Sequence, residues 1–314
     1  MNTLFYYAAV VTRFIAIVGI LLQTAIAADS QPPANVDPKD KIAVRRLFDA
    51  WKTPVRPRRL IGNIHYVGAS GVSSFLITTP AGHVLLDTGF ADTVPLIRTN
   101  VAQLGFKIGD IKFILSSHAH VDHTGGHALM KQLTGARIVA SAADAHLLAS
   151  GGADDFSPFP KEFLTYTPVK TDRVIQDNEI VSLGDVTLTA HLTPGHTKGA
   201  TTWTMETTDE GRRLHVVFFS STGLIEGTRL LKNPLYPNIA TDYEATFKKL
   251  KTLPCEVFFG PHGGMFAMAE KFDKLERGVK PNPFIDPDGW RELLAAGEKV
   301  FRAQLARERS EGRQ

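Results

Sequence analysis

The six-residue run from His118 to His123 constrains this chain more than any other feature. It has the sequence HAHVDH and follows the apolar segment Ile111–Leu115, which is typical of a buried strand. In an extended loop, residues two apart point the same way, so His118 and His120 can contact one metal ion together. Asp122 and His123 point away from that pair. The run is therefore predicted to begin a site for two metal ions.

Two more histidines lie in predicted turns downstream. His196 stands in Thr-Pro-Gly-His and His262 in Gly-Pro-His-Gly-Gly. With the first run they make five imidazoles and one carboxylate, a donor set that suits zinc, and catalytic zinc keeps one position open for water. A single histidine is more often a structural residue, but that reading does not explain a cluster of this density. The residues alone predict a two-zinc hydrolase.

The other aromatic and histidine side chains have more ordinary readings. His127, which follows Gly126 at a predicted helix start, is expected to cap that helix, with a place in the cleft as the alternative. Histidines within predicted strands or helices are expected to be packing residues: His65, His83, His146, His191 and His215. Three aromatic residues near a glycine-rich stretch form either a cleft wall or ordinary core: Phe156, Phe159 and Phe163.

The composition is that of a globular protein, and the charge excludes two classes of partner. The chain has 314 residues, of which 43% are apolar and 21% charged. A net charge of +3 is too small to indicate nucleic acid or an anionic membrane as a partner. We see no basic run with interleaved aromatic residues. The expected partner is a small-molecule substrate.

The N-terminus has the pattern of a secretory signal. Arg13 precedes the apolar run Phe14–Leu22, and Ala25-Ile26-Ala27 follows as a small-x-small cleavage pattern. We predict a signal peptide over residues 1–27 and a single mature domain over residues 28–314. An uncleaved membrane anchor is the alternative, but Arg13 interrupts the roughly 20 apolar residues that a span requires. We therefore expect a periplasmic protein with no stable membrane association after cleavage.

Strands and helices alternate in two similar halves, and each half delivers metal ligands from loops at strand ends. The first half contains the strand Ile111–Leu115 and the helix His127–Leu133. The second contains strands over Val186–Leu192 and Glu256–Phe259, and a long helix over Asp288–Arg307 follows. This alternation predicts an α/β fold. It does not by itself determine how the layers stack.

The run HAHVDHTGG, together with TPGHT, PHGG and the strand end LLDTG, resembles the metallo-β-lactamase superfamily over nearly the whole mature chain. The resemblance implies an αβ/βα four-layer sandwich, in which two sheets pack face to face with helices outside. Asp87 would orient the loop that carries His118 and His120 (the metal loop) without binding the metal itself. The implied ligands are, for the first zinc, His118, His120 and His196, and for the second zinc, Asp122, His123 and His262.

The segment after Val216–Phe219 points to one branch of this superfamily. Glyoxalase II, the metallo-type lactonases and many phosphodiesterases carry a metal-bridging Asp there, and two other β-lactamase types carry a Cys. This chain has Ser220-Ser221. It is thus similar to the third subclass of class B β-lactamases. In that subclass a serine matching Ser221 would hydrogen-bond a water on the second zinc; Ser220 is the adjacent alternative.

This branch implies hydrolysis of the β-lactam amide of penicillins, cephalosporins and carbapenems, and hence antibiotic resistance. The nucleophile would be a zinc-bound hydroxide oriented by Asp122, and the protein would be a monomer. A zinc lactonase, or another ester or phosphodiester hydrolase of the same fold, is the alternative. A non-catalytic metal-binding protein is disfavoured, because a degenerate member is expected to lose ligands.

Two residues depart from the pattern of the family. Cys255, the only cysteine, matches a position that many members bridge to a second cysteine, but the segment Asp286–Trp290 contains none. We expect the missing bridge to lower stability by up to a few kcal/mol, unless packing by Trp290 offsets it. Cys255 itself is predicted to be a buried strand residue. Gly223 stands where some members have a hydroxyl that contacts the substrate carboxylate.

Overall fold

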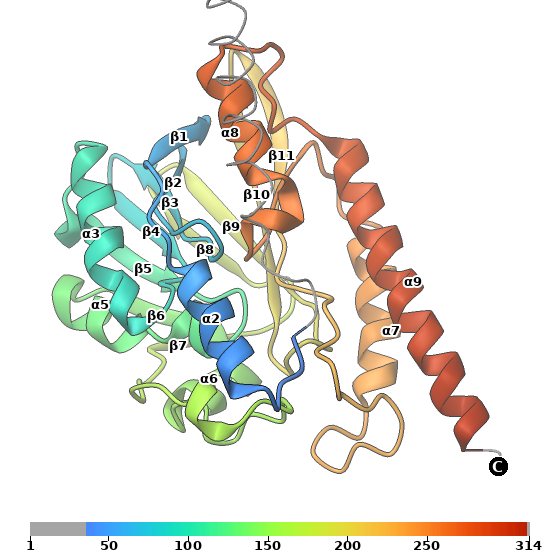
Figure 1. The fold of residues 1–314 in the computed structure, drawn as a ribbon. Coiled ribbons are helices and arrows are strands. Elements are labelled where there is room, and N and C mark those ends of the chain that lie inside the picture. Colours follow the sequence, from blue (N-terminus) through green and yellow to red (C-terminus); the bar gives the residue numbers. More distant parts are fainter. Residues whose placement is uncertain (1–35, 313–314) are drawn as a thin grey trace, which may run out of the picture. The chain divides into compact units, whose positions relative to one another are not determined.

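Two β-sheets lie face to face at the centre of the fold (Figure 1). The computed structural model describes residues 36–312. The first sheet has seven strands, in spatial order of their numbering. They are β1 (Arg58–Ile61), β2 (Ile64–Tyr66), β3 (Phe75–Thr79), β4 (Gly82–Leu86), β5 (Ile111–Leu115), β6 (Arg137–Ser141) and β7 (Arg173–Ile175).

The first sheet is antiparallel from β1 to β4 and parallel from β4 to β7. A parallel pair needs a crossover connection, usually a helix, and each parallel step here has one. The crossovers are α3 (Val94–Gln103), α5 (His127–Thr134) and α6 (Ala142–Ala149). The metal loop follows β5, and therefore lies at the end of a parallel strand, where loops are free to carry functional residues.

The second sheet has five strands in the order β12-β11-β10-β9-β8. They are β8 (Ile180–Leu183), β9 (Val186–Leu192), β10 (Thr201–Asp209), β11 (Arg212–Phe218) and β12 (Val257–Phe259). The pair β11–β12 is parallel, and the helix α7 (Ile239–Leu250) lies in its connection. The remaining helices are α2 (Lys41–Trp51), α4 (Val121–Thr124), α8 (Met268–Glu276) and α9 (Pro287–Glu311), with short 3₁₀ turns η1 (Ala91–Thr93), η2 (Ile108–Asp110), η3 (Lys161–Phe163) and η4 (Gly263–Phe266).

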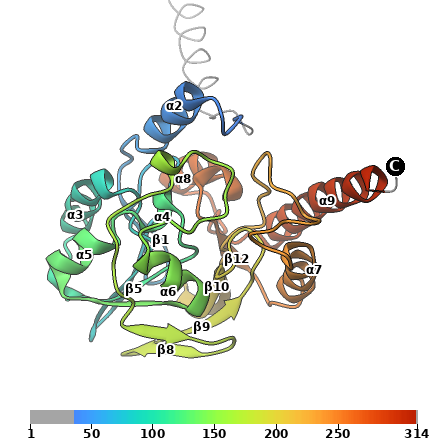
Figure 2. The same cartoon turned by 90° about the horizontal axis from the view of Figure 1, so that it is seen from below.

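The layers run helix, sheet, sheet, helix. The helices α3 and α5 lie outside the first sheet, and α7 and α9 lie beside one another outside the second, as two perpendicular views agree (Figures 1 and 2). This arrangement confirms the predicted four-layer sandwich. The described residues all belong to one structural unit, and the boundaries 28–314 stay a prediction.

Strand periodicity divides the first sheet between two cores. Successive side chains of a strand point to opposite faces, so Phe75 and Ile77 of β3 enter the core between the sheets, while Leu76 joins the core under α3 and α5. The inter-sheet core also contains Trp203 of β10, whose Nε1 donates a 3.0 Å hydrogen bond to the carbonyl of Ser116. This bond ties the second sheet to the residue that opens the metal loop.

Three local features were not foreseen from the sequence. A turn at Gly62, whose φ of +50° lies in the left-handed region that favours glycine, separates Ile61 from Ile64. The chain therefore forms a hairpin between β1 and β2. The short elements β7, β8, α6 and α8 were not predicted. Cys255 is half-buried and unpaired, and it precedes β12 rather than lying inside it.

The N-terminal prediction falls outside this description. The predicted signal peptide, residues 1–27, lies outside the described residues. Among residues 36–312, no helix combines the length and the apolar character needed to cross a membrane.

Candidate metal centre

The predicted metal ligands come from three segments that follow β5, β9 and β12. His118 and His120 lie in the loop after β5, and Asp122 and His123 belong to α4, the single helical turn that follows. The turn after β9 carries His196, and His262 directly precedes η4. The fold thus brings together six side chains that span 145 residues of sequence.

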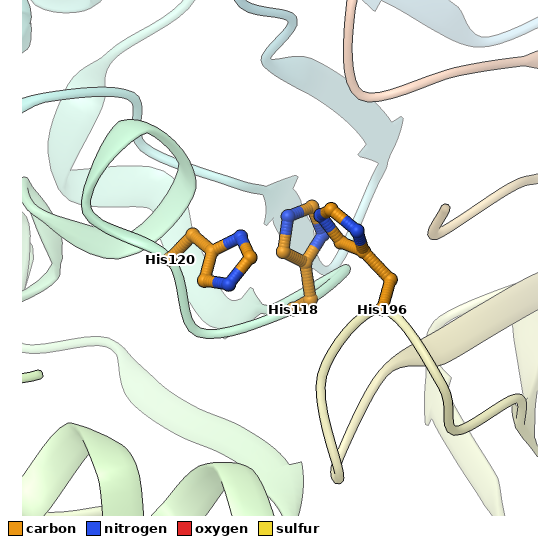
Figure 3. A group of neighbouring side chains, drawn as sticks. All are labelled: His118, His120 and His196. Atoms are coloured by element: carbon orange, nitrogen blue, oxygen red, sulfur yellow. The ribbon is translucent and has the colours of Figure 1, made fainter. Parts of the chain in front are cut away.

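The first group consists of His118, His120 and His196. Their candidate ligand atoms all lie within 4.8 Å of one another. The ring centroids are 4.8 Å apart for His118 and His120, and 4.6 Å and 4.7 Å from these two to His196. Figure 3 shows the three rings converging from two segments of the chain. This is the set that the family resemblance implied for the first ion.

The second group consists of Asp122, His123 and His262, again with ligand atoms within 4.8 Å of one another. Oδ2 of Asp122 lies 3.0 Å from Nε2 of His123 and 3.5 Å from Nε2 of His262. The ring centroids of His118 and His123 are only 4.2 Å apart, so the two groups adjoin. Two metal ions, one bound in each group, would therefore lie side by side in a single centre.

In four of the five imidazoles, Nδ1 faces an oxygen outside the ligand set. The partners are Ser117 Oγ at 3.2 Å from His118, the Gly223 carbonyl at 2.7 Å from His196, the Gly71 carbonyl at 2.9 Å from His262, and Asp87 Oδ2 at 3.5 Å from His123. Such partners set the tautomer and the ring orientation of metal-binding histidines. They leave Nε2 of each ring as the inward donor atom.

The donor chemistry fits a transition-metal ion. In the described part of the chain, Nε2 of His118 and Nε2 of His123 are buried without a hydrogen-bond partner, although buried polar atoms are normally paired. Burial, and then the neighbouring imidazoles, holds the pKa of His118 well below its usual value, so this ring stays neutral with a free lone pair. Burial likewise lowers the pKa of His262 to about 4. A cation with imidazole preference would satisfy these atoms.

Asp122 and His123 form a tightly coupled pair. Burial acts to raise the pKa of Asp122, but the adjacent His123 outweighs it and holds the pKa well below its usual range. Burial acts to lower the pKa of His123, but Asp122 and Asp87 raise it to about 10. Because a metal ion needs the neutral imidazole, binding at the second group would release a proton.

The two serines after β11 have different surroundings. Ser220 Oγ lies 3.0 Å from Thr193 Oγ1 in a fully buried network of hydroxyls. Ser221 Oγ accepts a 3.0 Å hydrogen bond from the backbone N–H of Gly223, the residue whose carbonyl faces His196. Ser221 therefore lies beside the first histidine group, and Ser220 does not face it.

His127 neither caps a helix nor lines a cleft. Its ring is fully buried, with Nδ1 2.8 Å from Thr88 Oγ1 and Nε2 2.9 Å from Ser116 Oγ. Both ring nitrogens thus face these two hydroxyls and not the backbone N–H groups at the start of α5. Both predicted roles were wrong, because the sequence could not show that the ends of β4 and β5 would place hydroxyls on either side of the ring.

Sequence reasoning also missed two residues around the site. Trp51 of α2 lies with its ring centroid 4.6 Å from that of His262, although nothing in the pattern of α2 marks it. Asp144 of α6 is buried and accepts a 3.2 Å hydrogen bond from Thr197 Oγ1, next to His196. Burial raises the pKa of Asp144 to about 7. A carboxylate in an apolar helix was the only available signal for it.

Comparison with known proteins agrees with this fold. The model of the metallo-beta-lactamase superfamily matches residues 67–262. The chain therefore belongs to the metallo-beta-lactamase superfamily. This membership confirms the resemblance drawn from HAHVDHTGG and the later histidine motifs.

The chain is similar to several solved structures and, over part of its length, to a curated protein. The native FEZ-1 metallo-beta-lactamase of Legionella gormanii is 39% identical, with a TM-score of 0.80, over 82% of this chain and 98% of that one. BJP-1, a subclass B3 metallo-beta-lactamase of Bradyrhizobium japonicum, is 40% identical, with a TM-score of 0.77, over 83% and 97%. The N-acyl homoserine lactonase AttM of Agrobacterium fabrum is 30% identical over 154 residues, which are 41% of this chain and 57% of that protein. The match thus covers little more than half of that curated relative.

Proposed function

We propose that this chain is an exported two-zinc β-lactamase that hydrolyses the amide bond of penicillins, cephalosporins and carbapenems. The observation that carries the proposal is the pair of adjoining three-residue groups, which together offer five imidazoles and one carboxylate. The likeness to FEZ-1 and BJP-1 extends over almost their full length and supports a β-lactam substrate. The protein would act in the periplasm as a monomer and confer antibiotic resistance.

Each ligand group has a defined role in this proposal. His118, His120 and His196 would hold one zinc ion, and a second would be held by Asp122, His123 and His262. Zinc in such a site lowers the pKa of water to about 7 and polarises a carbonyl oxygen.

Two side chains would orient the water that attacks the lactam carbonyl. Asp122 is a carboxylate at neutral pH, because His123 holds its pKa low, so it can accept a hydrogen bond from that water. Ser221 has a hydroxyl that can donate to a water held between the two adjoining groups, while its oxygen accepts from Gly223. Asp122 and Ser221 are the residues to which we assign catalytic roles.

The segment after β11 favours β-lactams over other substrates of this fold. Ser220 and Ser221 offer hydroxyls at this place. The lactonase and glyoxalase branches, which the family resemblance brings in for comparison, carry a metal-bridging carboxylate there instead. The apolar run before Ala27 supports export. A small net charge supports a small-molecule substrate rather than nucleic acid.

A lactone substrate is the second candidate. The partial similarity to the lactonase AttM favours it, although that match covers under half of this chain. Lactone and lactam hydrolysis both require attack on a ring carbonyl, so the fold alone does not separate them.

The test combines metal analysis with a substrate panel. We expect two zinc ions per purified mature chain, and opening of a penicillin, a cephalosporin and a carbapenem that chelator abolishes and added zinc restores. Two zinc ions with opening of an N-acyl homoserine lactone, but of no β-lactam, would favour the second candidate. Ring opening that persists after complete metal removal would contradict both.

A further inference from the structure

His120 is oriented differently from the other four ligand imidazoles. In those four, Nδ1 faces an oxygen outside the ligand set and Nε2 is left as the donor atom. In His120 it is Nε2 that faces outward, 3.4 Å from Oδ2 of Asp155. Its Nδ1 is therefore the atom left for a metal ion.

Asp155 comes from the loop that follows α6, a separate segment from the metal loop. Its side chain and that of His120 are both buried, with residue exposures of 4% and 7%. Neither Asp155 Oδ2 nor His120 Nε2 has a hydrogen-bond partner among residues 36–312. In that part of the chain, no Lys or Arg lies within ion-pair distance of the carboxylate. A buried carboxylate oxygen is costly unless a donor or a cation faces it, and the imidazole of His120 is the group that faces Oδ2.

The two oxygens of Asp155 face different structures. Oδ1 accepts a 2.8 Å hydrogen bond from the backbone N–H of Ser157 and so closes a turn of its own loop. The backbone carbonyl of Asp155 accepts from Lys161 Nζ at 3.0 Å, which holds the same loop. Oδ2 is thus left for His120. At 3.4 Å the contact is longer than a charge-assisted hydrogen bond of about 2.7–2.9 Å, and it acts electrostatically.

We propose that Asp155 is a positioning residue for His120. Its carboxylate keeps the proton of this imidazole on Nε2, presents Nδ1 to the metal, and joins the loop after α6 to the three-histidine group. A carboxylate facing the outer nitrogen fixes the tautomer of a ligand histidine and raises its basicity. The inference rests on the proposed function only in requiring that this group binds a metal ion.

Asp155→Asn separates this role from a purely structural one. Asparagine keeps one oxygen for the N–H of Ser157, but its amide carries no negative charge to attract the N–H of His120, and its nitrogen is not an acceptor. Asp154→Asn is the matched control, because Asp154 is the neighbouring carboxylate and pairs at 3.2 Å with His146, both side chains being more than half exposed.

The experiment is a zinc titration of the metal-free full chain against a competing chelator. We expect the wild type and Asp154→Asn each to bind two ions, and the affinity for each ion to be the same in both proteins. In Asp155→Asn, one ion should bind about 10- to 100-fold more weakly and the other with unchanged affinity. Unchanged affinity for both ions would overturn the proposal. So would a lower free energy of unfolding of the metal-free variant without any change in zinc affinity, since that is what a purely structural role requires.

A second measurement needs no variant. In the zinc-loaded wild type, long-range ¹H–¹⁵N NMR of the imidazoles should show His120 protonated at Nε2 and the other four ligand histidines protonated at Nδ1. Protonation of His120 at Nδ1 would overturn the proposal. Failure to open β-lactams would contradict the proposed function and leave this inference standing, whereas a wild type that binds no zinc would overturn both.

Discussion

The aromatic ring of Tyr243, in α7, lies directly against Gly195 in the turn that carries His196. A Cβ atom added to Gly195 would lie 2.9 Å from Cγ of that ring. The φ of Gly195 is +141°, in the region that side chains rarely adopt. The direction in which His196 enters the site therefore depends on a glycine and on the helix packed behind it.

Replacing this glycine should displace the turn. We expect Gly195→Ala to lower the free energy of unfolding by about 1–3 kcal/mol through backbone strain alone, and to lower zinc binding by the three-histidine group as well. Urea unfolding of the metal-free protein and zinc content would measure the two effects. Gly211→Ala is the control, because Gly211 also has positive φ, +79°, but an added Cβ would meet nothing within 4 Å. Equal losses of zinc in both variants would contradict the steric explanation.

The hydroxyl of Tyr243 has a separate effect that Tyr243→Phe isolates. It donates a 2.9 Å hydrogen bond to the Gly223 carbonyl, which also lies 2.7 Å from His196 Nδ1. Burial raises the pKa of Tyr243, so the hydroxyl remains a donor. We expect a loss of about 0.5–1.5 kcal/mol in the free energy of unfolding, with both zinc ions retained. Loss of a zinc ion from Tyr243→Phe would show that this hydrogen bond orients His196 more strongly than the packing does.

Asp87 should control how well the metal loop is held. Its carboxylate accepts from the backbone N–H of Ser117 at 2.7 Å and from the Ser117 hydroxyl at 2.5 Å. Asp87→Asn suits the left-handed φ of +58° but removes the charge. We expect zinc affinity to fall about 10- to 100-fold, measured by chelator competition. Asp185→Asn, at an exposed position, should leave the zinc affinity unchanged. An equal fall in zinc affinity in this control would mean that the loss of net charge is the cause.

The buried His127 should make the metal-free protein acid-sensitive. Burial lowers its pKa to about 3 from 6.5, so the unfolded chain binds the proton more tightly and stability falls as pH drops below 6.5. Between pH 7 and pH 5 the contribution is a loss of about 2 kcal/mol. Urea unfolding across this range should give a shallower pH dependence for His127→Gln than for the wild type. The exposed His146→Gln should keep the wild-type slope; an unchanged slope in His127→Gln would refute the prediction.

Trp290 lies in the segment that contains no cysteine to form the family's disulfide with Cys255. It is buried, and its ring centroid lies 5.6 Å from that of Phe219 and 5.8 Å from that of Phe258. We expect Trp290→Ala to cost about 3–5 kcal/mol in the free energy of unfolding. Val300→Ala, at an exposed position of the same helix, should stay within about 0.5 kcal/mol of the wild type. A small effect at Trp290 would mean that its packing does not offset the absent bridge.

Local patterns predicted many of the strands and helices, whereas the four-layer stacking was predicted only by the family resemblance. The strand from Val186 to Leu192 has the bounds that its alternation predicts, because the two faces of β9 have different surroundings. The elements that were missed are short or partly exposed, such as β7 and β8, whose burial patterns carry little periodic signal. For them, pairing with a neighbouring strand decides the structure, and that neighbour is remote in sequence.

The sequence by itself determined the chemistry of the candidate site. Six donor side chains, four in HAHVDH and two in glycine-flanked turns, suffice to predict a metal site, since donor identity is a property of the residues. Only the tertiary structure decided how each donor is held. Asp155 faces His120, Ser116 and Thr88 enclose His127, and Trp51 lies against His262. These contacts join segments that are far apart in the chain. Their geometry depends on sheet pairing and core packing, which a local sequence pattern does not reveal.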